Sequence, residues 1–139
     1  MAAKADFTED EWKAMQKGVT GAAALVSISD RDFTDSFGEA SAIAKYLAEQ
    51  HDKSESALVR DLAKVRGTGF GLTASAQEVE SETLDALHAA TETIGAKAPD
   101  ELDLYRQLVL GVAERAANAK GGLSAEETAA LEKIKGAVG

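Results

Sequence analysis

The sequence contains no cysteine, which excludes disulfides, thiolate metal sites, cysteine nucleophiles and thiol redox switching. Its stability must therefore come from side-chain packing. Basic residues are in the minority, with 15 lysines and arginines against 24 aspartates and glutamates and a net charge of −9. Because this charge repels phosphate groups and anionic lipid, we expect neither nucleic acids nor membranes as partners.

Long apolar runs are also missing. No stretch approaches the unbroken apolar length of a membrane span, and the first residues lack the apolar segment of a secretory signal. We therefore expect a soluble, cytoplasmic protein. A length of 139 residues, of which 45% are apolar, suits a single globular domain over residues 1–139, with residues 1–7 as a flexible N-terminal tail.

Proline occurs once, and alternating runs of β-branched residues are absent. Alanine is abundant, and apolar residues recur at spacings of three and four, which is the period of an amphipathic helix. The connections between these helical segments are short. The sequence thus predicts an all-α fold, a compact antiparallel bundle of about six helices.

Three capping boxes mark helix starts, each a hydroxyl residue followed three positions later by glutamate. The pairs are Thr8 with Glu11, Ser75 with Glu78, and Ser124 with Glu127. Phe7 and Trp12 flank the first box in the positions of a hydrophobic staple. Pro99 suits the first position of a further helix.

Helices are expected from Thr8 to about residues 27–29, from about residue 37 to residues 51–53, from Ser54 to about residue 65, from Ser75 to Gly95, from Pro99 to about residue 120, and from Ser124 onward. The helix after Pro99 is apolar around about half of its circumference, which predicts a central position. Gly18, Gly21 and Gly111 lie inside helices, where alanine is more stable, so each is expected to permit a close helix contact.

The first and fifth helices lead into segments of the same build, residues 29–35 and 119–125. In each, an apolar residue precedes a hydroxyl residue that starts the next helix. This similarity favours two pseudo-repeated helical units. The alternative remains open, because many helices begin with an apolar residue before a serine or threonine cap.

Residues 117–127, Ala-Asn-Ala-Lys-Gly-Gly-Leu-Ser-Ala-Glu-Glu, together with Leu131 and Ile134, resemble the helix-loop-helix signature of TerB-like tellurite-resistance proteins. In that family an Asp-Gly loop leads into a Ser-x-x-Glu helix start. The resemblance implies an all-helical bundle, an acidic surface that holds a divalent cation, and a non-catalytic role in stress response. Lys120 replaces the loop aspartate of the family, so the implied cation would belong to the loop near Asp30. Residues 7–12 and 105–139 are also similar to small uncharacterised bacterial helical proteins, which implies no mechanism.

Asp30, Asp32, Asp35 and Glu39 are hard oxygen donors close together in sequence, and they are the candidate ligands of a divalent cation. Their spacing is not that of an EF-hand, since Asp35 stands at the glycine position and Ser41 at the position of the bidentate glutamate. The alternative is a solvated acidic loop that stabilises the N-terminus of the next helix. No other cofactor is expected.

Asp85-x-x-His88 is half of the ligand pattern of di-metal sites in helical bundles. The second half is missing, because the other histidine, His51, has no carboxylate three residues before it. Helical periodicity also places Glu78, Glu82 and Asp85 opposite the apolar stripe and leaves His88 outside that stripe. We therefore interpret this segment as a solvated helix face.

The sequence contains no Gly-x-Ser-x-Gly, Walker or His-Glu-x-x-His motif, and no catalytic residue is assigned. The glycine-rich residues 67–71 predict a turn, whose Phe70 is a candidate cap for an apolar ligand cavity. Arg60, Lys64 and Arg66 form a basic cluster among acids, typical of a solvated helix face. The sequence favours a non-enzymatic interaction module that binds a protein partner or itself, and the TerB-like resemblance implies a role in stress response. The alternatives are a binder of small molecules or divalent cations, and an enzyme of unknown class.

Overall fold

The computed structural model describes residues 4–29, 36–54, 56–63, 75–118 and 125–138, and all regular secondary structure in these ranges is helical. The α-helices are α1 (Glu9–Ser29), α2 (Ser36–Lys53), α3 (Ala57–Leu62), α4 (Ala76–Lys97), α5 (Leu102–Asn118) and α6 (Ala125–Val138). Two turns of 3₁₀ helix, η1 (Lys4–Asp6) and η2 (Pro99–Glu101), lie before α1 and α5. The predicted all-α fold is confirmed.

Helix α1 begins with the predicted capping box. The Thr8 N–H donates to Glu11 Oε1 at 2.8 Å, and the Glu11 N–H donates to Thr8 Oγ1 at 3.1 Å. Both staple residues, Phe7 and Trp12, are buried in the core. Phe7 is the last residue of the segment expected to form a tail, so that segment joins the core at its end.

Helix α3 begins later than predicted. Its N-cap is Ser56 instead of Ser54, because Ser56 Oγ accepts the Val59 N–H at 3.2 Å. Ser54 Oγ accepts the Ser56 N–H at 3.2 Å and is therefore engaged just outside the helix. Two hydroxyl residues lie close together here, and the sequence alone gave no reason to choose the second.

Helix α4 continues two residues beyond the predicted end at Gly95 and stops at Lys97. The next residue, Ala98, leaves the helical conformation with φ −149° and ψ 63°. This departure is expected, because the residue before a proline is disfavoured in the α conformation. Pro99 then opens the η2 turn, and α5 follows from Leu102.

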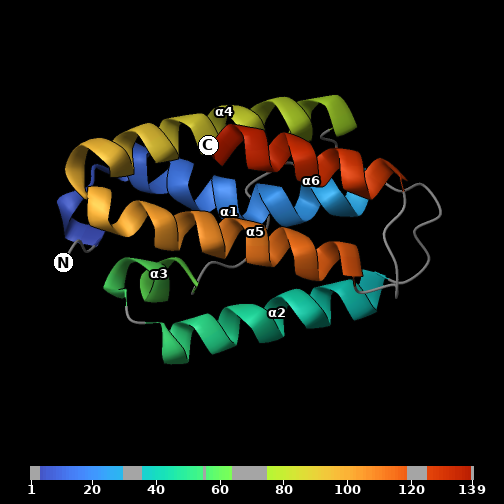
Figure 1. Cartoon of the computed structure of the whole chain (residues 1–139), viewed down its shortest axis with the longest axis horizontal. Coiled ribbons are helices and arrows are strands. Elements are labelled where there is room, and N and C mark those ends of the chain that lie inside the picture. The colour runs from blue at the N-terminus through green and yellow to red at the C-terminus, as the bar shows by residue number, and fades with distance from the viewer. Residues whose placement is uncertain (1–3, 30–35, 55, 64–74, 119–124, 139) are drawn as a thin grey trace.

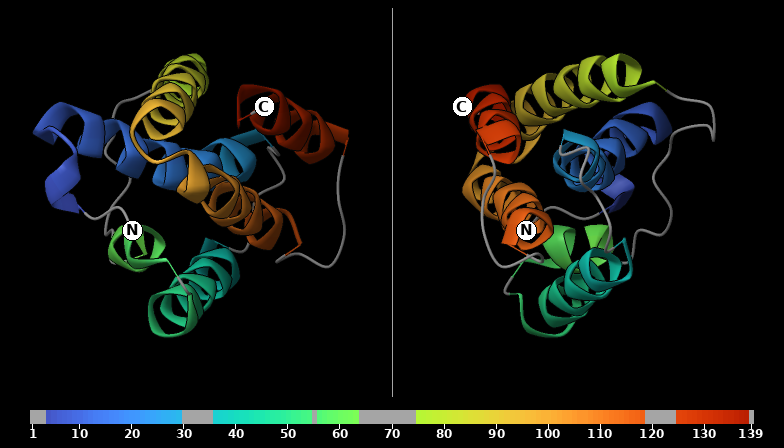
Figure 2. Two further views of the ribbon diagram at one scale, coloured as in Figure 1. Left: turned by 60° about the vertical axis from the view of Figure 1, so that its left-hand side comes forward. Right: turned by 90° about the vertical axis from the view of Figure 1, so that its right-hand side faces the viewer.

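Four helices, α1, α4, α6 and α5, form a bundle in which each packs against the next and α5 returns to α1 (Figures 1 and 2). Helices α1 and α5 run in one direction, and α4 and α6 run in the other (Figure 1). Helices α2 and α3 form a further layer, in which α2 packs on α5 and α3 contacts α1 and α5. This layer and α4 lie on opposite sides of the molecule (Figure 1).

The two helix pairs that the sequence comparison related pack differently. Helices α5 and α6 pack against each other, and the described parts of α1 and α2 form no comparable pair. A relation between the two halves thus stays a prediction from sequence, without a matching arrangement of these helices.

Helices α1 and α5 share the centre of the fold. The predicted inward face of α5 is buried from Tyr105 to Ala116, and α5 contacts α1, α2, α3, α4 and α6. Helix α1 is equally central, because it contacts α3, α4, α5 and α6. Within the ranges that the structure describes, no helix combines the length and the apolar character that a membrane crossing requires.

Gly18, Gly21 and Gly111 each permit the close contact that the sequence predicted. A Cβ atom on any of them would overlap a side chain of a neighbouring helix in the same chain. The facing side chains are Tyr105 of α5, Thr83 of α4 and Tyr46 of α2, respectively. The glycines therefore set how closely α1 approaches α4 and α5, and how closely α5 approaches α2.

Candidate functional site

The predicted cation ligands fall largely outside the described structure. Asp30, Asp32 and Asp35 lie outside the described residues, and the side chain of Glu39 in α2 is not described either. Across the described part of the chain, no group of three or more histidine, aspartate or glutamate side chains is placed to hold a metal ion. The cation site at residues 30–39 stays a prediction.

The half-motif on α4 lies on an outer face, as its periodicity predicted. Glu78, Glu82, Asp85 and His88 are all exposed. The other histidine, His51, belongs to α2, on the opposite side of the molecule, and its Nδ1 lies 3.2 Å from the carbonyl oxygen of Arg60. The structure therefore does not bring the two histidines together. Arg60 itself is exposed on α3, and its predicted companions, at 64 and 66, lie outside the described residues, as does the turn at 67–71 with Phe70.

A buried polar pair that the sequence did not reveal joins α3 to η2. The Ser56 hydroxyl donates to Glu101 Oε2, and both residues are buried. Serine beside a carboxylate is a composition found in hydrolytic sites, yet Ser56 Oγ is 3.2 Å from the Val59 N–H that it caps. The Ser56 hydroxyl is thus engaged in starting α3 and in fastening it to η2.

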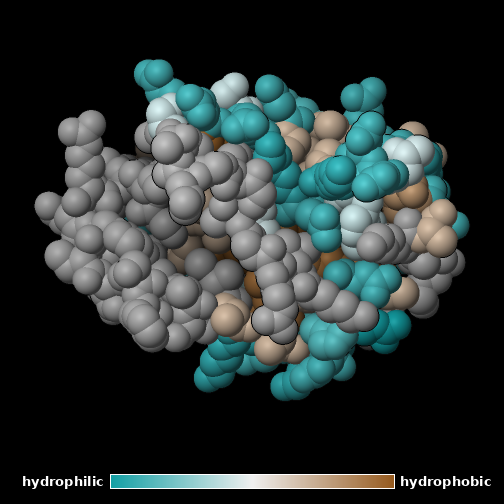
Figure 3. All heavy atoms as spheres, turned by 180° about the vertical axis from the view of Figure 1, so that it is seen from behind, coloured by the Kyte–Doolittle hydropathy of each residue, from teal (hydrophilic) through white to brown (hydrophobic). Residues whose placement is uncertain are grey.

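The outer face of α4 carries a row of carboxylates. Glu78, Asp85 and Glu92 recur every seven residues and are all exposed; we call them the acidic stripe. Seven residues are nearly two helical turns, so the three side chains follow one line that drifts by only about 20° per step. At a rise of about 1.5 Å per residue, the stripe is about 21 Å long. Seen from behind, hydrophilic side chains project along the upper edge of the molecule, where α4 runs (Figure 3).

Two further carboxylates of α4 are neutralised by neighbouring helices. Lys17 of α1 pairs with Glu82 at 3.0 Å, and Lys133 of α6 pairs with Glu80. Among the described residues, no salt bridge joins a stripe carboxylate to a cation. The two long-range ion pairs thus fix α4 to its neighbours and leave the stripe itself facing solvent.

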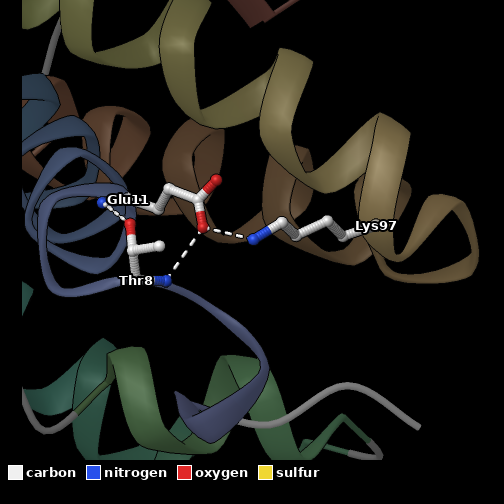
Figure 4. Close-up of polar contacts among 3 residues, drawn as sticks. All are labelled: Thr8, Glu11 and Lys97. Atoms are coloured by element: carbon white, nitrogen blue, oxygen red, sulfur yellow. Dashed lines mark hydrogen bonds and ion pairs between the residues drawn. The ribbon is translucent and has the colours of Figure 1, made fainter.

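A second polar cluster joins the start of α1 to the end of α4 (Figure 4). Glu11 Oε1 accepts a bond from Lys97 Nζ at 2.5 Å as well as the Thr8 N–H at 2.8 Å. These two bonds, the Lys97 bond above all, hold the pKa of Glu11 below its ordinary value of 4.5. Lys97 Nζ also lies 5.7 Å from the centre of the Phe7 ring. All four residues are thus engaged in closing this end of the bundle.

This cluster predicts an acid-dependent stability. Because the pKa of Glu11 is lower in the folded chain, its carboxylate stabilises the fold above pH 4.5 and loses that effect as the pH falls through the folded pKa. We expect Glu11→Gln to lower the melting temperature near neutral pH and to flatten its decline on the acid side. Thermal melts from about pH 7 to about pH 3 measure both effects.

Lys97→Met is the matched control, since it removes the cation and keeps an apolar stem beside Phe7. The variant should also flatten the acid decline, and adding Glu11→Gln to it should change little more. An unchanged acid slope in Glu11→Gln would contradict the role assigned to the Lys97 bond.

Comparisons with known proteins add no relative: no protein-family model, no curated protein and no solved structure matches this chain. The chemistry of the described surface therefore has to be judged from its own geometry. Within the described ranges, the feature best suited to recognising a charged partner is the acidic stripe along α4.

Proposed function

We propose that this chain is a non-catalytic helical module that binds a protein partner through the acidic stripe of α4. The supporting observation is the stripe itself, three exposed carboxylates in one line without a cation paired to them among the described residues. The partner is expected to present lysine or arginine side chains along one side of a helix. The role in stress response that the TerB-like resemblance implies stays a prediction.

The helix that carries the acidic stripe, α4, is packed firmly into the bundle, which favours binding at the stripe. The opposite face of α4 is buried against α1 and α6 through Leu87, Ala90 and Ile94, none of which is exposed to solvent. The Lys17 and Lys133 ion pairs also hold α4 to these two helices. Because the α4 backbone under the stripe is already ordered before binding, the binding of a partner costs little conformational entropy in this helix.

The charge pattern defines the chemistry of the partner. Carboxylates repeating every seven residues match a helix that carries basic side chains at the same spacing, as charged flanking positions do in coiled coils. The net charge of −9 attracts such a partner over a longer range and raises its rate of association. Both effects weaken with added salt.

Two buried hydroxyl groups of the described residues, those of Ser56 and Tyr105, serve the fold, which supports a non-catalytic role for them. The Ser56 hydroxyl caps α3, and the Tyr105 hydroxyl donates to the Met15 carbonyl oxygen at 2.9 Å inside the core. Both residues are buried. The function proposed here therefore uses the outer surface of the bundle.

The test uses a synthetic helical peptide with a lysine every seven residues, and fluorescence anisotropy measures its binding. We expect the triple variant Glu78→Gln, Asp85→Asn, Glu92→Gln to bind it about tenfold more weakly than the wild-type chain. Three exposed ion pairs at about 0.5 kcal/mol each account for this factor.

The control carries the same change in net charge on other helices. Asp52→Asn, Glu114→Gln and Glu132→Gln neutralise three exposed carboxylates on α2, α5 and α6. This control should bind the peptide nearly as well as the wild-type chain. An equal loss in both triple variants would show attraction by net charge alone and would overturn the proposal, as would a wild-type chain that does not bind the peptide.

A further inference from the structure

The second half of α2 is attached differently from α3, the helix that follows it. Among residues 44–53, whose side chains are described, none is buried, and the most sheltered are only half-buried. Helix α3, which follows directly, buries Leu58, Val59 and Leu62 completely or nearly so. Segments with few buried apolar contacts open at a lower free energy than the core.

Tyr46 makes a specific contact between this half of α2 and α5, and Leu47 beside it also packs against the core. The Tyr46 ring lies against Gly111, and its hydroxyl donates to the Gln107 carbonyl oxygen at 3.4 Å, the long end of hydrogen-bond range. The guanidinium of Arg115, an exposed residue, lies 5.2 Å from the ring centre. Tyr46 thus fills a notch on α5 that exists because residue 111 has no side chain.

The next attachment along the chain is of another kind. Ser56 bonds to Glu101 in a buried pair, and α3 packs against α1 and α5. The chain therefore passes, within about ten residues, from a partly buried contact at Tyr46 to a fully buried one at Ser56.

From this contrast we infer that residues 44–53 of α2 are a releasable strap, latched by Tyr46 in the notch at Gly111. The strap leaves α5 while α1, α4, α5 and α6 stay packed. Release uncovers the notch at Gly111 on α5, which the Tyr46 ring otherwise fills. This device is independent of the acidic stripe.

Hydrogen exchange followed by mass spectrometry tests the strap in the full-length chain. In the wild-type protein, the backbone amides of residues 44–53 should exchange at least about tenfold faster than the buried part of α1. In Gly111→Ala the added Cβ overlaps the Tyr46 hydroxyl and lies 2.8 Å from Tyr46 Cε1, so the ring has to leave the notch. Exchange in residues 44–53 should then rise by a further factor of about ten, with α1 and α4 unchanged.

Two further variants keep the test decisive. Tyr46→Ala removes the latch from the other side and should reproduce the pattern of Gly111→Ala. Gly136→Ala is the control, because a Cβ there meets nothing within 4 Å, and it should leave exchange in residues 44–53 unchanged. The inference is overturned if residues 44–53 exchange in step with α1 in the wild-type chain, or if both latch variants accelerate all helices equally.

Discussion

Replacing Tyr105 by alanine is expected to lower the free energy of unfolding by about 3–5 kcal/mol, the loss typical of a large aromatic side chain removed from a core. Tyr105 is fully buried and reaches from α5 to α1, where its hydroxyl donates to the Met15 carbonyl oxygen at 2.9 Å. The missing side chain of Gly18 makes room for that hydroxyl. Equilibrium urea unfolding followed by circular dichroism measures the loss.

Tyr105→Phe is the control that separates packing from hydrogen bonding. It keeps the ring and removes only the bond to Met15, so the expected loss is about 1 kcal/mol. A loss in Tyr105→Ala no larger than that of Tyr105→Phe would contradict the central packing role of the ring.

The wild-type chain and Tyr105→Phe are also expected to differ in how their stability declines at alkaline pH. Burial raises the pKa of Tyr105 well above its ordinary value of 10.0. As the pH passes about 10, the unfolded chain therefore ionises at Tyr105 before the folded chain does, and the stability that is complete below that pH is progressively lost above it. Tyr105→Phe cannot ionise at this position, so its stability should decline less steeply. Parallel declines in the two proteins would argue against a buried neutral phenol.

Local hydrogen bonding explains which parts of the fold could be predicted. The Thr8 and Ser75 caps form as expected, because each hydroxyl accepts an N–H only three residues away. The start of α3 was placed wrongly at Ser54, since the cap that forms uses Ser56, whose hydroxyl is also fixed by Glu101, 45 residues farther along the chain. A contact across that separation leaves no local pattern.

The surface charges could likewise be predicted where they depend on local periodicity, but not where they depend on the packing of two helices. Periodicity alone placed Glu78, Glu82 and Asp85 outward, and the structure confirms it. Periodicity could not tell that Glu82 is neutralised by Lys17 of α1, because that pair depends on how two helices are packed. The burial of Glu101 against α3 likewise became visible only in the fold.

The glycines inside helices are a case in which the sequence predicted that a close contact exists but could not identify the residue on the other helix. Their presence indicated close helix contacts, and the structure supplies the opposing side chains. Gly21→Val is expected to lower the free energy of unfolding by about 2–3 kcal/mol, since the new side chain must displace Thr83 or separate α1 from α4. Urea unfolding measures this loss, and Gly136→Ala, which meets open space, should instead gain up to about 1 kcal/mol.

A double-mutant cycle identifies Thr83 as the residue that makes Gly21 necessary. Thr83 is fully buried, and its Oγ1 finds no hydrogen-bond partner within the described structure, so removing the hydroxyl sacrifices no such bond. Thr83→Ala removes a hydroxyl and a methyl group from α4, and Gly21→Ala adds a methyl group on α1 in the space that this leaves. We therefore expect the double variant to be at least about 1 kcal/mol more stable than the sum of the two single changes predicts. Strict additivity would mean that α1 and α4 do not meet at this pair, and the packing described for the centre of the bundle would have to be abandoned.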